Sequence, residues 1–504
     1  MRGAGATIAA SGVGLAIQIV ATVILARLLT PSDFGLVTMV TTFSLLLVNF
    51  GLNGFTEAVL QRETISHPLA SNLFWINLSA GALLTIAFAA SGSLLARLYS
   101  NPQVAHVALG ISLTIFITST SVLHLALLKR AMRFSALSAN DIVAAVLSVL
   151  LSIILGWAGW GYRALIAGAI ARPLIQSVGA GMLCRWVPGL PRRAIGTGAM
   201  VRFAMNIYGR FIINYFARNM DNLLVGWRFN AQALGFYKKA YDLFALSSSQ
   251  LVAPLTSVAV SALSRLNKDA VEYRRYLFNS ISVLAFTGMG LGAALTLTGG
   301  DVIRLLLGPG WETAGHIFTF FGPGIGIMLL YGTHGWIHLS IGRPDRWFRW
   351  VIVEFVVTGL LFVLGLPWGP AGIALAWTAS FWILFLPAFW YAGKPMALGI
   401  QPVLAAVWKY LLASLLAGLA SKMIMAGVPY LSAVPNAGGA LVRILVNFTA
   451  FAGLYITAVV LLHRGWSPIQ QVGRLLREMI PLDRLFRTAP TVAVSTRVNE
   501  GLAP

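Results

Sequence analysis

Charged residues are scarce in this sequence. Only 10% of its 504 residues are Asp, Glu, Lys or Arg, whereas soluble domains carry about 25%. Hydrophobic residues make up 58%, so a water-soluble fold of this composition would leave large apolar surfaces facing water. A single cysteine, Cys184, excludes an intrachain disulfide and a cysteine-based metal cluster. The composition is typical of a protein embedded in a lipid bilayer.

Signatures of enzymes and ATPases are also missing. No phosphate-binding Walker loop occurs, and no arrangement of a nucleophile with a base is visible. The longest predicted loop on the side opposite the N-terminus covers only about 299–312. The sequence therefore predicts a transporter rather than an enzyme, with no bound cofactor.

Hydrophobic stretches long enough to cross a bilayer recur along nearly the whole chain. A spanning helix needs roughly 20 apolar residues. Such stretches lie near 6–29, 34–54, 72–96, 104–128, 136–157, 161–183, 203–228, 233–262, 276–298, 313–341, 347–365, 369–393, 405–426 and 437–462. They predict an all-α polytopic membrane protein with about 14 transmembrane helices.

The basic residues indicate how the chain is oriented. With the N-terminus inside, 24 of the 36 Lys and Arg residues fall on the inner side and six on the outer side. Lys and Arg accumulate in cytoplasmic loops, so both termini are predicted to be cytoplasmic and the membrane to be a bacterial inner membrane. The net charge of +21 then reflects topology and attraction to anionic lipids. Nucleic acid is not an expected partner.

A repeat divides the chain into two predicted lobes. Residues 25–37 align with 225–237 at an offset of 200, which pairs Gly35 with Gly235. Two further alignments, 129–134 with 342–347 and 160–165 with 368–373, follow in the same order. Internal repeats are common in transporters. We predict an N-lobe at 1–183, a cytoplasmic linker at 184–199, a C-lobe at 200–393, two extra helices at 394–462 and a basic cytoplasmic tail at 463–504.

The first of these repeated segments carries a family resemblance. Leu25-Ala-Arg-Leu-Leu-Thr-Pro-Ser-Asp-Phe-Gly35 resembles the first-loop signature of polysaccharide transporters, the Wzx-type flippases of the MOP exporter superfamily. Asp221-Asn-Leu-Leu-Val-Gly226 and the following 233–241 resemble the matching signature of the second lobe. The resemblance implies two pseudo-symmetric six-helix lobes, alternating access and an undecaprenyl-diphosphate-linked oligosaccharide as substrate. It also implies polysaccharide polymerase and assembly proteins as partners.

Ionisable residues at membrane depth suggest where such a substrate binds. They are costly against lipid, so they normally face a cavity or a partner. On the stretch 203–228 the polar residues fall within an arc of about 160°. The residues of this face that we select are Arg210, Asn214, Arg218 and Asp221, and Lys238 lies on the following stretch. Arg and Lys suit the oxygens of a diphosphate.

Other interpretations of the charged residues stay open. Asp221 can pair with Arg218 or Arg228 in a structural ion pair, and Asp242 with Lys238 or Lys239. Arg27 is a further candidate, because it can line the outer mouth or cap a helix C-terminus. Arg163 and Arg172 are also candidates, either in the cavity or at the interface, where Asp141 can pair with them.

Carboxylates within the stretches are candidates for coupling to a proton or sodium gradient. They are Asp141, Asp242 and Glu354, of which the first and last occupy comparable places in the two lobes. A salt bridge is the alternative for each. His334 and His338 share a helix face, but no carboxylate lies nearby as a third ligand, so we predict no metal site.

Three functions fit this sequence. The first is a flippase for a lipid-linked oligosaccharide in O-antigen, capsule or exopolysaccharide synthesis. The second is another exporter of the same superfamily, for the peptidoglycan lipid precursor or for drug-like cations. A cation exporter needs an acidic cavity, whereas the candidate wall here is net basic. The third is a membrane polysaccharide polymerase or ligase, which needs a large outer loop with catalytic Arg or His.

Overall fold

The structure, a computed structural model, describes residues 2–62, 64–192, 197–428 and 437–479. Within these ranges the side chains of 2–11, 51, 53, 206, 210, 213, 214, 217, 247–254, 257 and 474–479 are not described. The described part is helical and contains no strand. Its helices are α1 (Arg2–Leu28), α2 (Pro31–Gln61), α3 (His67–Ala90), α4 (Gly92–Leu98), α5 (Gln103–Arg130), α6 (Phe134–Trp157), α7 (Tyr162–Cys184), α8 (Thr197–Arg228), α9 (Ala231–Leu266), α10 (Ala270–Leu307), α11 (Glu312–Tyr331), α12 (His334–Ser340), α13 (Pro344–Gly365), η1 (Leu366–Trp368), α14 (Gly369–Gly393), η2 (Lys394–Met396), α15 (Ile400–Ala426), α17 (Ala437–His463) and α18 (Ser467–Met479).

Each of the fourteen predicted stretches coincides with one helix or with two consecutive helices. Among the described residues, ten helical stretches are long and apolar enough to cross a membrane, and one of these, 344–396, holds both α13 and α14. The part of α1 whose side chains are described, Gly12–Leu28, is also apolar but shorter. The prediction of an all-α polytopic protein is confirmed, whereas the count of fourteen crossings stays a prediction.

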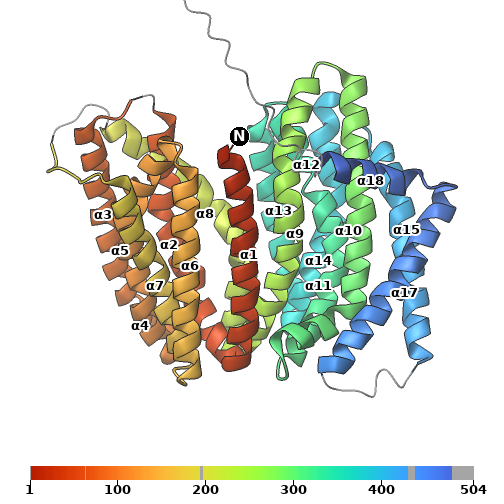
Figure 1. Ribbon diagram of the computed structural model, residues 1–504, viewed down its shortest axis with the longest axis horizontal. Coiled ribbons are helices and arrows are strands. Elements are labelled where there is room, and N and C mark those ends of the chain that lie inside the picture. The colour runs from red at the N-terminus through yellow and green to blue at the C-terminus, as the bar shows by residue number, and fades with distance from the viewer. Residues whose placement is uncertain (1, 63, 193–196, 429–436, 480–504) are drawn as a thin grey trace, which may run out of the picture.

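The helices form two groups. Figure 1 shows α2 to α7 gathered on one side, α9 to α17 on the other, and α1 standing between them. In the first group α2 packs on α5, α5 on α3 and α7, and α6 on α7. In the second, α10 packs on α11, α11 on α9 and α14, and α13 on α14. The lobe boundaries given above stay a prediction.

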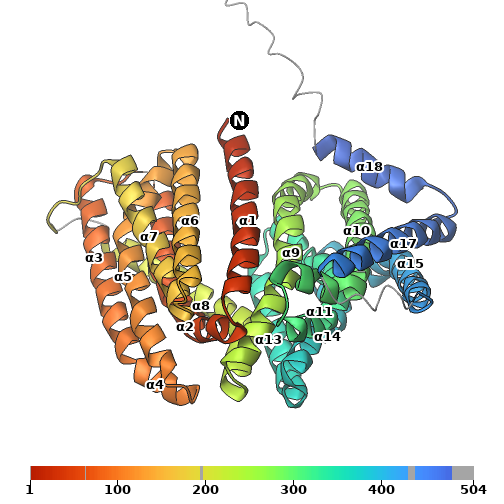
Figure 2. The ribbon, with the colours of Figure 1, turned by 60° about the horizontal axis from the view of Figure 1, so that its bottom comes forward.

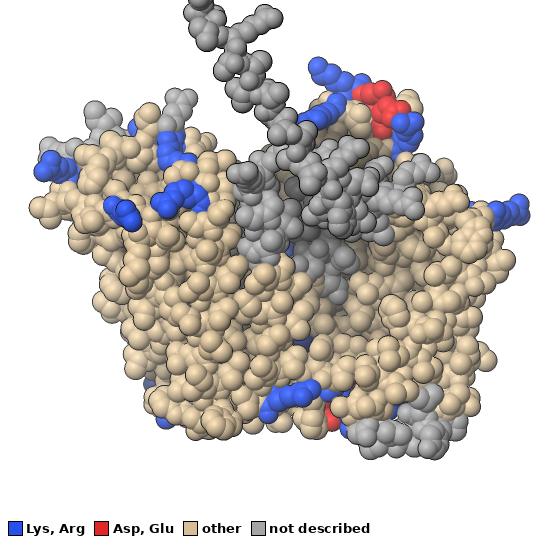
Figure 3. Space-filling model, in the orientation of Figure 1, with Lys and Arg blue, Asp and Glu red and all other residues tan. Residues whose placement is uncertain are grey.

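The outer surface agrees with a membrane location. In the face shown in Figure 3, Lys and Arg lie near the two ends, with a broad uncharged band between them. Large apolar side chains are exposed along this length, among them Leu83, Ile86 and Leu419. Contact of these apolar side chains with lipid tails is favourable, whereas their contact with water costs free energy. Helix α18 lies across the end of the second group, at the same end as the N-terminus (Figures 1 and 2).

Helices α15 and α17 pack on each other and on α10. Arg443 of α17 holds Asp301 of α10 through two guanidinium nitrogens, at 2.5 to 3.1 Å. The Tyr455 hydroxyl donates to the Phe286 carbonyl at 2.7 Å. Both contacts join α17 to α10, so the last two spans are attached to the second group.

The two groups meet where α2 crosses α9. A β-carbon added to Gly35 would lie 1.6 Å from the Ala231 carbonyl oxygen. One added to Gly235 would lie 1.8 Å from the Pro31 oxygen. Residues 31 and 35 correspond to residues 231 and 235 at the offset of 200. Each helix therefore contributes the same two positions, and the crossing is reciprocal. Only glycine lets the two backbones come this close.

The helix starts at this crossing are also equivalent. Thr30 caps α2, with its hydroxyl oxygen accepting from the Asp33 N–H while the Asp33 carboxylate accepts from the Thr30 N–H at 2.9 Å. Asn230 caps α9, and its side-chain oxygen accepts from the Ala233 N–H at 2.8 Å. Such caps satisfy N–H groups that have no partner within the helix. The repeated sequence therefore builds the same turn twice.

Replacing Gly35 by alanine will destabilise the protein, because the added methyl has no space against the Ala231 carbonyl. Overpacking of this kind costs about 1–3 kcal/mol or more. The measurement is the midpoint of thermal unfolding of purified protein in detergent. Gly453→Ala is the control, since no atom lies within 4 Å of its added β-carbon. Equal midpoints for the two variants would contradict the close crossing.

Candidate functional site

The residues of the predicted polar face of α8 lie in different environments in the structure. The Arg218 side chain is exposed, and its charge lies close enough to Glu354, Tyr331 and Tyr241 to influence them. The side chains of Arg210 and Asn214 lie outside the described residues. Of the α8 residues selected from the sequence, Arg218 is thus the one placed on open surface in the described part.

Asp221 does not face a cavity, which corrects the expectation for this residue. Its side chain is 0% exposed. One carboxylate oxygen accepts from the Tyr237 hydroxyl at 2.7 Å and from the Trp377 indole at 2.9 Å, and the other accepts from the Asn222 N–H at 2.8 Å. These donors satisfy the carboxylate without an arginine partner. Asp221 therefore joins α8 to α9 and α14 and does not line a substrate path.

Glu354 of α13 belongs to a chain of polar contacts. Its carboxylate accepts from the Tyr331 hydroxyl at 3.0 Å, and that hydroxyl accepts from the Trp350 indole at 2.8 Å. Arg218 of α8 supplies the nearby positive charge. Since Arg218 and Glu354 come from helices far apart in sequence, the fold brings together a cation and a carboxylate that were selected separately.

The lysines of α9 have different neighbours. Lys238 forms an ion pair with Asp242, one helical turn later. Lys239 lies over the Phe34 ring of α2, with its ammonium 4.0 Å from the ring centroid. The pairing of Lys238 is the structural alternative considered above, whereas Lys239 contacts the other group of helices through a cation–π interaction.

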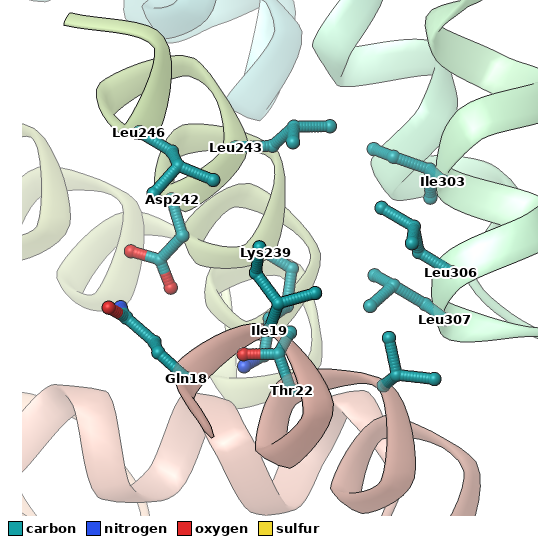
Figure 4. Close-up of a pocket in the computed structure, with 11 residues that line it drawn as sticks. Gln18, Ile19, Thr22, Lys239, Asp242, Leu243, Leu246, Ile303, Leu306 and Leu307 are labelled. Carbon is teal, nitrogen blue, oxygen red and sulfur yellow. The ribbon is translucent and has the colours of Figure 1, made fainter. Parts of the chain in front are cut away.

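A cavity of about 70 Å³ lies between α1, α9 and α10 (Figure 4). Its polar wall is formed by Gln18, Thr22, Lys239 and Asp242. Its apolar wall is formed by Ile19, Val23, Leu243, Leu246, Ile303, Leu306 and Leu307. A cation, a carboxylate and an amide facing a wall of Leu and Ile suit a ligand that is polar at one end and apolar at the other.

At the end opposite the N-terminus the two groups of helices are closed against each other at Trp311, which is 2% exposed. The Trp311 ring makes edge contacts with Phe34 of α2 and Phe236 of α9, at 5.7 and 5.9 Å between centroids. Its indole N–H donates to the Ala26 carbonyl of α1 at 2.9 Å. A single side chain from the α10–α11 link therefore contacts both groups of helices.

Two unpaired helix carbonyls explain this closure. The Ala26 carbonyl would normally accept from the Thr30 N–H, but Asp33 takes that N–H into the capping box. The Leu305 carbonyl has Pro309 four residues later, which carries no N–H. The Arg27 guanidinium donates to Leu305 at 2.9 Å, and Trp311 donates to Ala26. Helix α1 and the second group thus cap each other's helix ends.

Arg27 also lines a second, surface cavity of about 580 Å³ at this end. Arg304 and the segment 308–311 form the part of its wall that belongs to the second group of helices. Arg27 of α1 thus lines a surface cavity and caps the C-terminal end of α10, whereas its place at an outer mouth stays a prediction.

The candidates of α6 and α7 lie apart from these cavities. Arg172 pairs with Asp141 at 3.3 Å, with side chains 54% and 52% exposed. Arg163 lines a third cavity near the α6–α7 link. His334 and His338 are buried, and no group of three metal-binding side chains occurs among the described residues.

The comparison with known proteins decides the family. The model of the family described as "Polysaccharide biosynthesis protein" matches residues 24–315, more than half of the chain. This chain belongs to that polysaccharide biosynthesis protein family. The matched region contains α2 to α10 and both repeated turns.

Relatives of this polysaccharide biosynthesis protein include three bacterial proteins. The teichuronic acid biosynthesis protein TuaB of Bacillus subtilis is 24% identical, over 64% of this chain and 67% of its own. The lipopolysaccharide biosynthesis protein WzxC of Escherichia coli is 22% identical, over 61% and 62%. The succinoglycan biosynthesis transport protein ExoT of Rhizobium meliloti is 21% identical, over 66% and 68%. The alignments thus span about two thirds of these relatives.

Solved structures show the same fold for this member of the polysaccharide biosynthesis protein family. The lipid II flippase MurJ, in an inward closed conformation, aligns with a TM-score of 0.69 at 14% identity, covering 90% of this chain and 97% of MurJ. An inward-facing multidrug resistance MATE transporter of the MOP superfamily aligns at 0.62 and 12% identity, covering 76% and 94%. These two solved structures thus show an all-α, polytopic membrane fold for this chain.

The sequence alone missed Trp311, Gln18 and Thr22. Trp311 follows Gly308-Pro-Gly310 in a predicted outer loop, where tryptophan is usually a membrane-interface residue. The absence of an N–H at Pro309 was the available signal, but the carbonyl that it leaves unpaired is identified only once the helix end is known. Gln18 and Thr22 lie in an apolar stretch and are neutral, so charge gave no indication of them.

Trp311→Phe will open the closed end more often, because it keeps the ring but removes the N–H that donates to Ala26. Loss of one such hydrogen bond, worth about 0.5–1.5 kcal/mol, predicts a roughly two- to tenfold faster reaction of a buried reporter. The reporter is Leu29→Cys in a Cys184→Ser background, labelled by a thiol reagent in detergent. Trp157→Phe, an exposed tryptophan at the end of α6, should leave the rate unchanged. An unchanged rate in Trp311→Phe would refute the closure.

Proposed function

We propose that this protein moves an undecaprenyl-diphosphate-linked oligosaccharide from the cytoplasmic to the periplasmic leaflet of the bacterial inner membrane, for O-antigen, capsule or exopolysaccharide synthesis. The observation that carries the proposal is the cavity between α1, α9 and α10, with its polar wall facing an apolar one. A diphosphate with a sugar is strongly polar and its polyprenyl chain is apolar, so the substrate has the same two-sided character.

The proposed path combines this cavity with the exposed cation of α8. Lys239 in the cavity and Arg218 on open surface are the cations that we assign to the diphosphate. Arg guanidinium binds phosphate oxygens in pairs, and Lys adds a point charge. Arg210 and Asn214 keep their proposed role on α8. Lys238, Arg163 and Arg172 are less suited, since two of them already hold carboxylates.

Alternating access follows from the closed end. In the proposed orientation both termini are cytoplasmic, so Trp311 and Arg27 close the periplasmic side. The substrate would then enter from the cytoplasmic side, and separation of the two groups at Trp311 would release it outside. Polymerase and assembly proteins would receive it there.

The test of the function is translocation of a lipid-diphosphate oligosaccharide into reconstituted vesicles. The variant Arg218→Gln with Lys239→Gln should fold and lose at least about tenfold in initial rate, because charge-assisted hydrogen bonds contribute about 1.5–3 kcal/mol each. The matched control removes the same charge types from the α9–α10 link, with Arg265→Gln and Lys268→Gln. A full rate in the first variant would refute the proposed cations.

Further substrate arms of this assay separate the alternatives. Vesicles are also supplied with the peptidoglycan lipid precursor, which shares the diphosphate, and with a fluorescent organic cation. Transport of the oligosaccharide substrate alone supports the proposal. Transport of only the precursor or only the cation would assign the protein to one of the other exporter classes.

Glu354 is the carboxylate that we propose for coupling to a proton or sodium gradient. Asp141 and Asp242 have ionic partners at hydrogen-bond distance, whereas the Glu354 carboxylate accepts a hydrogen bond from the Tyr331 hydroxyl. Arg218 links it electrostatically to the proposed diphosphate site. A gradient-driven change at Glu354 would therefore alter the charge balance around Arg218.

Glu354→Gln is expected to transport the substrate at a rate that no longer responds to an imposed gradient, because its side chain cannot ionise. The measurement compares vesicles with and without proton and sodium gradients. Glu312→Gln, which alters a carboxylate in the outer α10–α11 link, should retain the wild-type response. A preserved response in Glu354→Gln would exclude this residue as the coupling group.

A further inference from the structure

The α6–α7 link and the start of α2 form a separate depression of about 620 Å³ at the end opposite the N-terminus. Its lining comes from three segments of the first group of helices. They are the start of α2 with Thr30, Ser32, Asp33 and Leu36, Gln103 of α5, and 159–163 of the α6–α7 link. The depression is distinct from the cavity between α1, α9 and α10, with which it shares no lining residue.

The α6–α7 link presents an aromatic ring at this depression. Trp160 lies between Gly159 and Gly161, whose φ angles are +79° and +55°. Glycine adopts these left-handed conformations without strain. The Trp160 side chain is 53% exposed, so the backbone displays the ring instead of burying it. A β-carbon at residue 161 would lie 3.1 Å from a carboxylate oxygen of Asp33, so glycine also preserves the space beside that oxygen.

Hydrogen-bonding groups surround the ring. One Asp33 oxygen accepts from Thr30, through its N–H at 2.9 Å and its hydroxyl at 2.6 Å. The other oxygen, on the side of Gly161, has no hydrogen bond among the described contacts. The side chains of Gln103 and Arg163 likewise have no partner within the described part of the chain. The depression therefore offers a free acceptor, an amide and a guanidinium beside an exposed indole.

These groups match the chemistry of a sugar ring. Each sugar hydroxyl both donates and accepts, which suits a carboxylate, an amide and a guanidinium together. The C–H groups on one face of the ring are apolar and pack on an aromatic surface. A simple anion is a poor match because Asp33 faces the same space as Arg163, and a lipid chain is a poor match for so polar a lining. A tryptophan that only anchors the link at the membrane interface would not need the free Asp33 oxygen or Gln103.

We propose that this depression is a saccharide-binding subsite on the exit side of the protein. Thr30 lines both the depression and the surface cavity that contains Arg27 and Arg304. A sugar held here would therefore lie next to the closed end through which the substrate is released. That the natural ligand is the sugar part of the released substrate rests on the proposed function, whereas sugar binding itself does not.

The test is saturation-transfer NMR on the full-length protein in lipid nanodiscs, with lipid-free cellotetraose and tetragalacturonic acid as a neutral and an acidic probe. Wild type should transfer saturation to at least one tetrasaccharide. Trp160→Ala and Gln103→Ala should each reduce the signal at least threefold, and Trp160→Phe should retain most of it. Trp157→Ala is the matched control, since Trp157 is 83% exposed at the end of α6, directly before the same link, but does not line the depression.

Each outcome bears on the proposal. Loss of signal in Trp160→Ala with an unchanged unfolding midpoint supports the subsite. No signal from either tetrasaccharide with wild type, or equal signals from Trp160→Ala and Trp157→Ala, would overturn it. The vesicle assay above is independent of this result. Sugar binding without transport would refute the proposed function alone, and transport without sugar binding would refute the subsite alone.

Discussion

The reciprocal crossing of α2 and α9 is the constraint on which the rest of this structure depends. Gly35 and Gly235 allow each helix to receive the backbone carbonyl of the other at a distance that no other residue permits. The crossing positions the two helix starts, and with them the capping box that leaves the Ala26 carbonyl without its usual donor. Trp311 then finds both an acceptor and two aromatic neighbours. The closed end is thus a consequence of backbone proximity several residues away.

Much of the fold could be predicted from the sequence, because it depends on apolar stretches and on a repeat that are visible in the sequence itself. Apolar stretches of membrane length gave the helices, and the offset of 200 paired Gly35 with Gly235 before their contact was known. The family resemblance depended on the same two turns. These features are local or repeated, and a single sequence suffices to recognise them.

The site was only partly predictable, because helical periodicity gives a face but not what the face contacts. Asp221 lies on the same predicted face as Arg218, yet Tyr237 and Trp377 bury it while Arg218 stays exposed. The expected pairing of Asp242 with Lys238 was one of the stated alternatives, and it needs only neighbouring turns of one helix. The Leu and Ile wall from α10 was unpredictable, since every span of this chain is rich in such residues.

Helix α8 is attached to both groups of helices. Its first half is attached to α2, with the hydroxyls of Tyr208 and Tyr215 donating to the carbonyls of Leu46 and Thr42. Its last turns are attached to the second group through Asp221. One continuous helix therefore connects the two groups of helices, which move relative to each other in the proposed alternating-access cycle. In that cycle the bending of α8 would have to be absorbed by the short segment 216–220 between the two attachments, which would make this segment the pivot of the motion.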